Sequence, residues 1–120
     1  MKKLLTLLLA SLFFTFPAIA FDPDDVVHVD LVCKSPAMLM EVAEVHVSKN
    51  MQAAVEHIQS NKERWTDDCA SLPMPFPLKL LEKVETFSGP GGQVTIWRGE
   101  LQINEGMIVY VAQIIDSEGA

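Results

Sequence analysis

Three histidines are the first residues to consider, because imidazole serves both metal binding and proton transfer near neutral pH. His28 falls in a segment that alternates like a strand, and His46 and His57 fall in two segments with helical spacing. A metal site would gather two of these side chains with Asp30 or Glu56. No two histidines are four residues apart, the spacing that places both on one helical face. The sequence therefore predicts no metal site and no cofactor. A periplasmic metal-binding protein that uses the histidines stays as an alternative function.

Nucleophilic catalysis requires a nucleophile, a base beside it and a group that orients the base. The two cysteines are expected to be bonded to each other. The serines lie in cap or turn contexts without the motif of a nucleophile elbow: Ser35, Ser48, Ser71 and Ser88. The glycines of residues 89–92 carry no lysine and stand between strands, unlike a phosphate-binding loop. We therefore predict no catalytic residues and a protein that is not an enzyme.

Aromatic side chains are better candidates for function. Trp97 and Tyr110 fall in neighbouring expected strands, Phe87 lies at the turn before them, and Arg98 follows Trp97 directly. Tryptophan, tyrosine and arginine are the side chains that most often anchor a binding surface. The sequence thus predicts a binding surface formed by Phe87, Trp97, Arg98 and Tyr110. The alternative is that Trp97 and Tyr110 pack as core against the helical segment.

Cys33 and Cys69 are the only cysteines of the chain, and they enclose its helical part. In an oxidising compartment, two cysteines in a short chain most often form a disulfide with each other. In the chain-entropy view, closing a loop of this length stabilises the folded state by about 4 kcal/mol. We therefore predict a structural disulfide between Cys33 and Cys69.

Residues 1–20 have the three parts of a secretory signal peptide. Two lysines come first, an apolar run covers Leu4–Phe16, and residues 18–20 read Ala-Ile-Ala, a small-x-small cleavage site. The run is shorter than the roughly 20 apolar residues of a membrane-spanning helix. We expect cleavage before Phe21, a single mature domain over residues 21–120, a periplasmic or secreted location, and no membrane association after cleavage.

The mature chain is strongly acidic. The full chain has 9 basic and 16 acidic residues, and removing the two lysines of the signal changes its net charge from −7 to −9. Such a charge repels phosphate backbones and anionic lipids, so nucleic acid is disfavoured as a partner and a protein with a basic or mixed surface is favoured. The plainer interpretation is that the charge keeps an exported protein in solution. We predict a non-catalytic exported binding or adaptor module. A small protein inhibitor of a secreted enzyme is the second candidate.

The segment before the first cysteine is expected to bring that cysteine to the core. Residues 21–25 hold three aspartates around a proline and are predicted to be a loosely packed start. Residues 26–33 alternate between two faces with the period of a strand. The face that includes Cys33 would carry three further apolar side chains, Val27, Val29 and Leu31.

Two helices are predicted between the cysteines. Ser35-Pro36 marks a helix start, because serine can cap a free backbone N–H and proline presets the first helical residue. Apolar residues at spacings of three and four continue to residue 60 with a break at residues 48–50, so residues 35–60 should form an antiparallel helical hairpin. Residues 61–68 are polar and are expected to leave the helix, with Trp65 as an apolar anchor.

Three antiparallel strands are predicted within residues 78–115. Three prolines at alternate positions in residues 73–77 forbid a helix and suggest an extended lead-in. The expected strands and turns are 78–84, a turn at 88–92, 93–101, a turn at 104–106, and 107–115. Both faces of the last strand are apolar, as in a strand that is buried on two sides, lines a small barrel or meets a partner. The predicted fold class is α+β: a disulfide-closed helical hairpin packed against a small antiparallel sheet or partial barrel.

The strand region also resembles the small barrels of bacterial Src-homology-3-like domains. The similarity covers residues 78–115: an entry strand, a glycine-rich turn, an aromatic middle strand at Val94–Arg98, and Gly106 followed by Tyr110. In that family the aromatic residue comes sooner after the glycine and a fifth strand completes the barrel; the strand before Cys33 could supply it. The resemblance implies a binding module. The layout of the whole chain is similar to small exported bacterial proteins to which we attach no function.

Overall fold

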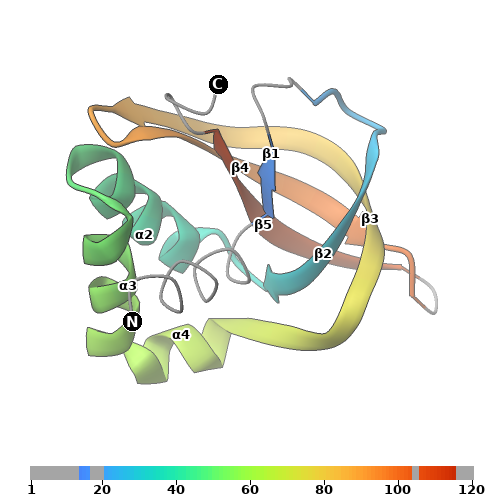
Figure 1. The fold of residues 1–120 in the computed structure, drawn as a ribbon. Coiled ribbons are helices and arrows are strands. Elements are labelled where there is room, and N and C mark those ends of the chain that lie inside the picture. Colours follow the sequence, from blue (N-terminus) through green and yellow to red (C-terminus); the bar gives the residue numbers. More distant parts are fainter. Residues whose placement is uncertain (1–13, 17–20, 104–105, 116–120) are drawn as a thin grey trace.

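The computed structural model describes residues 14–16, 21–103 and 106–115. Within these ranges the elements are β1 (Phe14–Phe16), β2 (Val26–Cys33), α2 (Ala37–Ser48), α3 (Met51–Ser60), α4 (Lys62–Asp68), β3 (Cys69–Gly89), β4 (Gly92–Leu101) and β5 (Met107–Ile115). The helices gather on one side of a strongly curved sheet (Figure 1). The α+β prediction is confirmed. The predicted signal lies outside the described residues except for β1, and the predicted turn at 104–106 lies outside them except for Gly106.

Four antiparallel strands pair in a closed ring. β2 pairs with β3, β3 with β4, and β4 with β5. The ring closes where Cys33 of β2 stands opposite Tyr110 of β5. β3 makes this possible because it sweeps around the sheet, pairing with β2 in its first half and with β4 in its second (Figure 1). The three strands predicted in the last part of the chain are confirmed as antiparallel neighbours.

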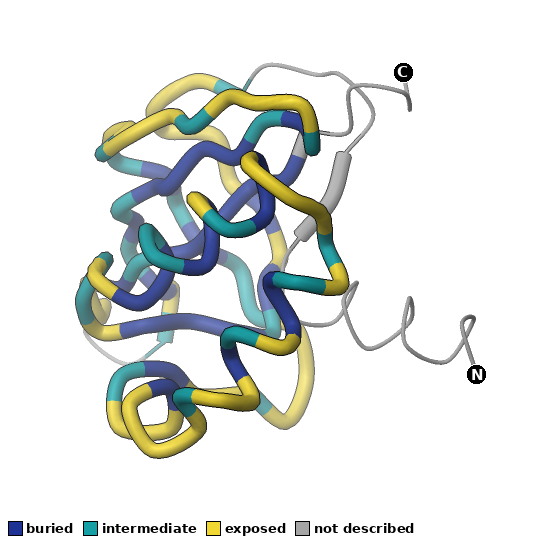
Figure 2. The backbone as a smooth tube through the Cα atoms, turned by 90° about the vertical axis from the view of Figure 1, so that its left-hand side faces the viewer, coloured by how far each residue is buried: buried dark blue, intermediate teal, exposed yellow. Residues whose placement is uncertain are grey.

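The sheet separates two apolar clusters, and Figure 2 shows the buried stretches running through the middle of the molecule. The inner cluster lies on the face that the ring encloses and consists of Val27, Val29, Val32, Leu78, Leu80, Trp97, Leu101, Val109 and Val111. The helix-side cluster joins the other face to the helices and includes Leu39, Val42, Ala54, Trp65, Ile96 and Ile114. β5 supplies side chains to both clusters between Val109 and Ile114, so both faces of that part of the strand are covered within the protein, whereas Met107 and Ile108 at its start are exposed.

Gly99 shows how closely the inner cluster is packed. A Cβ atom at this position would lie 2.9 Å from Cγ of Leu78, which is fully buried. Real side chains do not approach so closely, so only glycine leaves room for Leu78 at this point of the ring.

The predicted face of the first strand is wrong, because β2 contains an irregularity at Asp30. Between the pairs Val29–Phe76 and Leu31–Ser71, β2 has a single residue and β3 has the four residues 72–75. A register change of this kind alters which face the following side chains use. Val27, Val29 and Val32 therefore lie in the inner cluster, whereas Leu31 and Cys33 lie in the helix-side cluster.

The beginning of β3 also differs from the prediction. The strand starts at Cys69, nine residues before the expected start at Leu78. Pro73 and Pro75 fall within the unpaired residues 72–75 opposite β2, where a missing N–H costs no ladder hydrogen bond. The unpaired residues 72–75 thus accommodate these prolines within β3. The prolines do not form a separate lead-in between the helices and the sheet.

The two predicted helices are confirmed, with a break between Ser48 and Met51. α2 buries the predicted apolar stripe, and α3 begins where Asn50 Oδ1 accepts a hydrogen bond of 2.8 Å from the Ala53 N–H. The predicted cap at Ser35 is wrong, since α2 starts at Ala37 without a side-chain cap. α2 and α3 contact each other, and no helix in the described ranges is long and apolar enough to cross a membrane.

Two segments that were predicted to be irregular are ordered. Residues 62–68 were expected to leave the helix but form α4, so that prediction is wrong. Trp65 of α4 is buried in the helix-side cluster, as expected for an apolar anchor. Residues 21–25 form a turn on β3: the Asp24 N–H donates to the Leu80 carbonyl at 2.7 Å, and the Leu80 N–H donates to the Asp25 carbonyl at 2.8 Å. Asp24 has a φ of 76°, a conformation that aspartate tolerates better than most residues.

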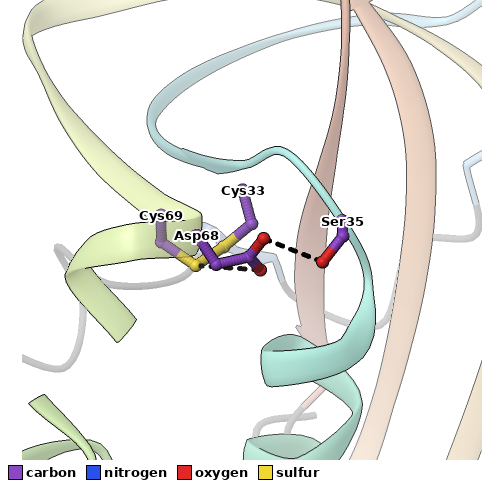
Figure 3. The surroundings of a disulfide bond; sticks show 4 residues. All are labelled: Cys33, Ser35, Asp68 and Cys69. Carbon is purple, nitrogen blue, oxygen red and sulfur yellow. Dashed lines mark hydrogen bonds between the residues drawn. A yellow bond between two sulfur atoms is a disulfide. The ribbon is translucent and has the colours of Figure 1, made fainter. Parts of the chain in front are cut away.

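The predicted disulfide is present (Figure 3). Cys33 and Cys69 stand directly opposite each other on β2 and β3, and both are buried. Asp68 lies beside the bond, held by a hydrogen bond of 2.8 Å from Ser35 Oγ and by the Lys34 N–H, which donates to the Asp68 carbonyl at 2.8 Å. A buried disulfide between strands indicates an oxidising, exported location.

Candidate functional site

A groove forms where the β3–β4 turn approaches the end of α2. The Gly91 N–H donates a hydrogen bond of 2.8 Å to the Val47 carbonyl, one of the last carbonyls of that helix. A Cβ atom added at Gly91 would lie 2.2 Å from the carbonyl oxygen of His46. A Cβ atom added at Gly89 would lie 2.4 Å from the carbonyl oxygen of Val47. These glycines therefore permit close contact between backbones. Gly92 is the position in this turn with a positive φ, 128°.

The groove is open and has a volume of about 540 Å³. It lies between α2, α3 and the end of β3, and its lining combines apolar, acidic and hydroxyl side chains: Glu41, Glu44, Val45, Val47, Ser48, His57, Phe87 and Ser88. Phe87 and Val45 are half-buried and pack against the helix-side cluster. The groove thus offers a fixed apolar wall beside two carboxylates.

Glu41 is already paired within the protein. His57 Nε2 lies 3.1 Å from its Oε1 atom, and Arg64 Nη2 donates to its Oε2 atom. The hydrogen bond from Arg64 is the largest influence on the pKa of Glu41 and lowers it; partial burial acts in the opposite direction, and His57 lowers it further. Glu41 is therefore ionised at neutral pH and joins α2 to α3 and α4.

Glu44 has a different environment. It lies one helical turn after Glu41 on α2 and is exposed, and its carboxylate makes no ion pair among the described residues. Its backbone carbonyl accepts a hydrogen bond of 2.7 Å from Ser48 Oγ. Glu44 is thus the negative side chain of the groove that remains available to a ligand.

Two serines and a histidine share this groove, which raises the question of catalysis. An activated serine needs a hydrogen bond to its base. In the part of the chain that the structure describes, no hydrogen bond joins Ser48 or Ser88 to His57, and the hydroxyl of Ser48 donates to a backbone carbonyl. The arrangement lacks the contact that would activate a nucleophile.

The structure does not bring the four predicted binding residues together. Trp97 is fully buried in the inner cluster, where its Nε1 atom donates to Gln113 Oε1 at 3.0 Å. Consecutive residues of a strand point to opposite faces, so Trp97 and Arg98 do not share a surface. That alternation was available in the sequence and is the signal that would have separated them.

Arg98 and Tyr110 are brought together. They stand directly opposite each other on β4 and β5 and lie on the outer face of the sheet. Arg98 Nε donates to Glu82 Oε1 at 2.8 Å, and Tyr110 is half-buried against the helix-side cluster. Phe87 lies elsewhere, in the wall of the groove. Of the four predicted residues, Phe87 belongs to the groove and Arg98 and Tyr110 form a separate outer pair.

The histidines lie apart from one another. His28 is exposed on β2, His46 is buried in the last turn of α2, and His57 faces Glu41 across the groove. Within the described ranges, one group of three potential metal ligands occurs, Cys33, Asp68 and Cys69. Its two sulfur atoms are bonded to each other and are not thiolate ligands in this state.

Glu41, Glu44 and the valines of α2 were missed as site residues. Their spacing places them on α2, but the sequence contains no pattern that brings Phe87 of β3 or His57 of α3 beside them. The glycines of the β3–β4 turn are the sequence feature most closely connected with the groove. The sequence predicted only a turn at these glycines, and not their contact with α2.

Comparison with known proteins finds no protein family that matches the chain, no similar curated protein and no similar solved structure.

Proposed function

We propose that this protein is a non-catalytic exported binding module whose groove receives a basic side chain of a partner protein. The observation that carries the proposal is the position of Glu44 beside the apolar wall formed by Val45 and Phe87. Among the described residues, the Glu44 carboxylate makes no ion pair. A lysine or arginine side chain has an apolar stem and a charged end. Its stem fits against Phe87 while its charge reaches Glu44.

The acidic balance of the mature chain supports the same kind of partner. A net charge of −9 attracts a basic surface over a distance and raises the rate of encounter. Glu41 has a supporting part in this proposal: its pairing with His57 and Arg64 fixes the groove wall, and Glu44 makes the contact.

The proposed frame of the site is the disulfide-closed helical pair, arranged as an antiparallel hairpin, with the closed strand ring as a small barrel behind it. The resemblance to Src-homology-3-like barrels stays a prediction and agrees with a binding role. A small inhibitor of a secreted enzyme remains a special case of this proposal, in which the partner is an enzyme.

The proposal is tested with a short synthetic peptide that carries one lysine next to leucine, titrated into the purified exported protein and followed by NMR. We expect shifts at Val45, Phe87 and Ser88. Glu44→Gln should weaken binding by two- to fivefold, about 0.5–1 kcal/mol for one partly exposed charge pair. Glu56→Gln is the matched control, because Glu56 is exposed on α3 and does not line the groove.

Equal weakening by the two substitutions would show that only overall charge matters, and would reject the groove as the site. Phe87→Ala should weaken binding of the peptide further. It should weaken binding of free lysinamide to a smaller extent. Capture from envelope extract at low salt, compared between the wild type and Glu44→Gln, then identifies the partner. If that partner is an enzyme that loses activity when bound, the inhibitor role is established.

A further inference from the structure

A second interaction surface follows from the position of β1. Phe14, Thr15 and Phe16 pair in parallel with Gln113, Ile114 and Ile115 of β5. The same three residues of β5 pair with β4, so β1 occupies the opposite edge of the strand. We refer to the backbone of residues 113–115 on this side as the β5 edge.

The residues that cover the β5 edge belong to the predicted signal peptide. Phe21, the first residue after the predicted cleavage site, packs against the inner cluster, so the processed chain begins with a residue that the domain holds. Cleavage would remove β1 and leave the β5 edge without its parallel neighbour. β2 does not replace it, because among the described residues β2 forms a strand pair with β5 only at Cys33 and Tyr110, away from residues 113–115.

The β5 edge has none of the usual features that prevent strand addition. Edge strands in soluble proteins are commonly protected by charged residues or proline. Residues 111–115 read Val-Ala-Gln-Ile-Ile, without charge and without proline. Val111 through Ile114 are all buried, so the strand is held firmly while its edge stays regular. Such an edge is a ready template for an added strand.

We propose that the processed protein binds an extended segment of a partner protein at the β5 edge by parallel strand addition. The segment is uncharged and alternates apolar, polar and apolar side chains, because the Phe-Thr-Phe segment that occupies this edge has that pattern. The surface is separate from the groove and does not depend on it.

A second copy of the chain is a less suitable occupant for two reasons. Two copies related by a two-fold axis would pair their β5 edges antiparallel, whereas the pairing at this edge is parallel. Each processed copy also carries a net charge of −9, which opposes self-association. The favoured occupant is therefore a different protein.

The first test is the N-terminus of the exported protein, measured by mass spectrometry. We expect it at Phe21. Retention of residues 14–16 would overturn the proposal, because the edge would stay covered.

The second test uses the processed protein and a synthetic peptide of residues 12–18, flanked by serines for solubility. Binding is measured by calorimetry, and backbone amide exchange reports where the peptide lies. We expect saturating peptide to slow exchange at least tenfold at those amides of residues 113–115 whose N–H groups point to the β5 edge, and to leave the groove residues unchanged. The matched control is the same peptide N-methylated at Thr15 and Phe16. Strand neighbours alternate their N–H groups, so either orientation loses a donor, and binding should fall about tenfold.

Failure of the peptide to bind, or equal binding of the methylated peptide, would overturn strand addition at this edge. If the processed protein formed a dimer in which the amides of residues 113–115 exchange slowly, the β5 edge would belong to a second copy of the chain. That result would overturn the proposal of a different partner protein. A protein that binds the lysine peptide but not the Phe-Thr-Phe peptide retains the groove function and refutes the present inference, so the two proposals fail separately.

Discussion

Trp97 Nε1 donates a hydrogen bond of 3.0 Å to Gln113 Oε1, and both side chains are buried on the enclosed face of the sheet. The bond joins β4 to β5 in a region that is otherwise apolar. A buried indole N–H without a partner is costly, so this pair explains why a glutamine is tolerated in a strand of valines and isoleucines.

Gln113→Leu should lower the free energy of unfolding by about 1–3 kcal/mol, because it removes the acceptor of the Trp97 N–H. Chemical denaturation measures the change. The control is a double-mutant cycle with Trp97→Phe: in the phenylalanine background, which has no N–H, Gln113→Leu should cost clearly less. Equal costs in both backgrounds would contradict a role for the hydrogen bond.

Gly91→Ala should destabilise the protein by about 1–3 kcal/mol, since the added Cβ would lie 2.2 Å from the His46 carbonyl oxygen and force the turn away from α2. The NMR signals of the groove residues Val47 and Phe87 should shift. Ser60→Ala, an exposed change at the end of α3 outside the groove, should leave both stability and these signals nearly unchanged. A stable Gly91→Ala protein with an unaltered groove would be incompatible with the close contact described.

Replacing both Cys33 and Cys69 by serine should lower the free energy of unfolding by about 4 kcal/mol, through the greater freedom of the unfolded chain. Thermal melting and denaturation in the absence of reductant measure the effect. Binding of the lysine peptide by the fraction that stays folded should persist. Unchanged melting would mean that the disulfide contributes nothing to stability.

Asp68 should slow reduction of the disulfide. Its Oδ2 atom lies 3.9 Å from Cys69 Sγ (Figure 3), and since a disulfide sulfur carries no proton, the contact places a negative charge beside the bond. That charge repels an attacking thiolate and disfavours the thiolate that leaves. Asp68→Asn should therefore be reduced by dithiothreitol about three- to tenfold faster than the wild type.

The control for Asp68 is Asp67→Asn, which removes the charge of an exposed neighbour. It should change the reduction rate little. If both substitutions accelerated reduction equally, the effect would reflect the net charge of the protein, and the placement of Asp68 by Ser35 would be irrelevant to it.

Glu41 should contribute to stability above its ordinary pKa of 4.5 and lose this contribution in acid. Its pKa is lowered in the folded protein, chiefly by the hydrogen bond from Arg64, so folding favours the ionised form. The contribution is complete above pH 4.5 and disappears as pH falls through the lowered folded pKa. Because the Glu41 side chain is 38% exposed, we expect only about 0.5 kcal/mol.

The difference in unfolding free energy between the wild type and Glu41→Gln, measured from pH 7 to pH 3, should shrink on the acid side. Glu56→Gln should show a smaller change over the same range. A difference that grew as pH fell would have the wrong sign for a lowered pKa.

The sequence by itself determined the elements whose signals are local. Two cysteines in a short chain predicted the disulfide, apolar residues at spacings of three and four predicted α2 and α3, and alternating strands separated by glycine-rich turns predicted β4 and β5. The strand pattern of the sequence also places Trp97 and Arg98 on opposite faces of the sheet, because consecutive residues of a strand point in opposite directions.

Only the tertiary structure decided the features that depend on contacts between distant segments. The irregularity at Asp30 arises from pairing with β3, and it moves Leu31 to the helix-side cluster although the local pattern placed it with Val29. The groove forms because glycines of one turn can lie against carbonyls of a helix more than forty residues earlier, as with Gly91 and Val47. Hydrophobic periodicity records which face of an element is buried, but not what lies against it, so the sequence alone did not reveal the site.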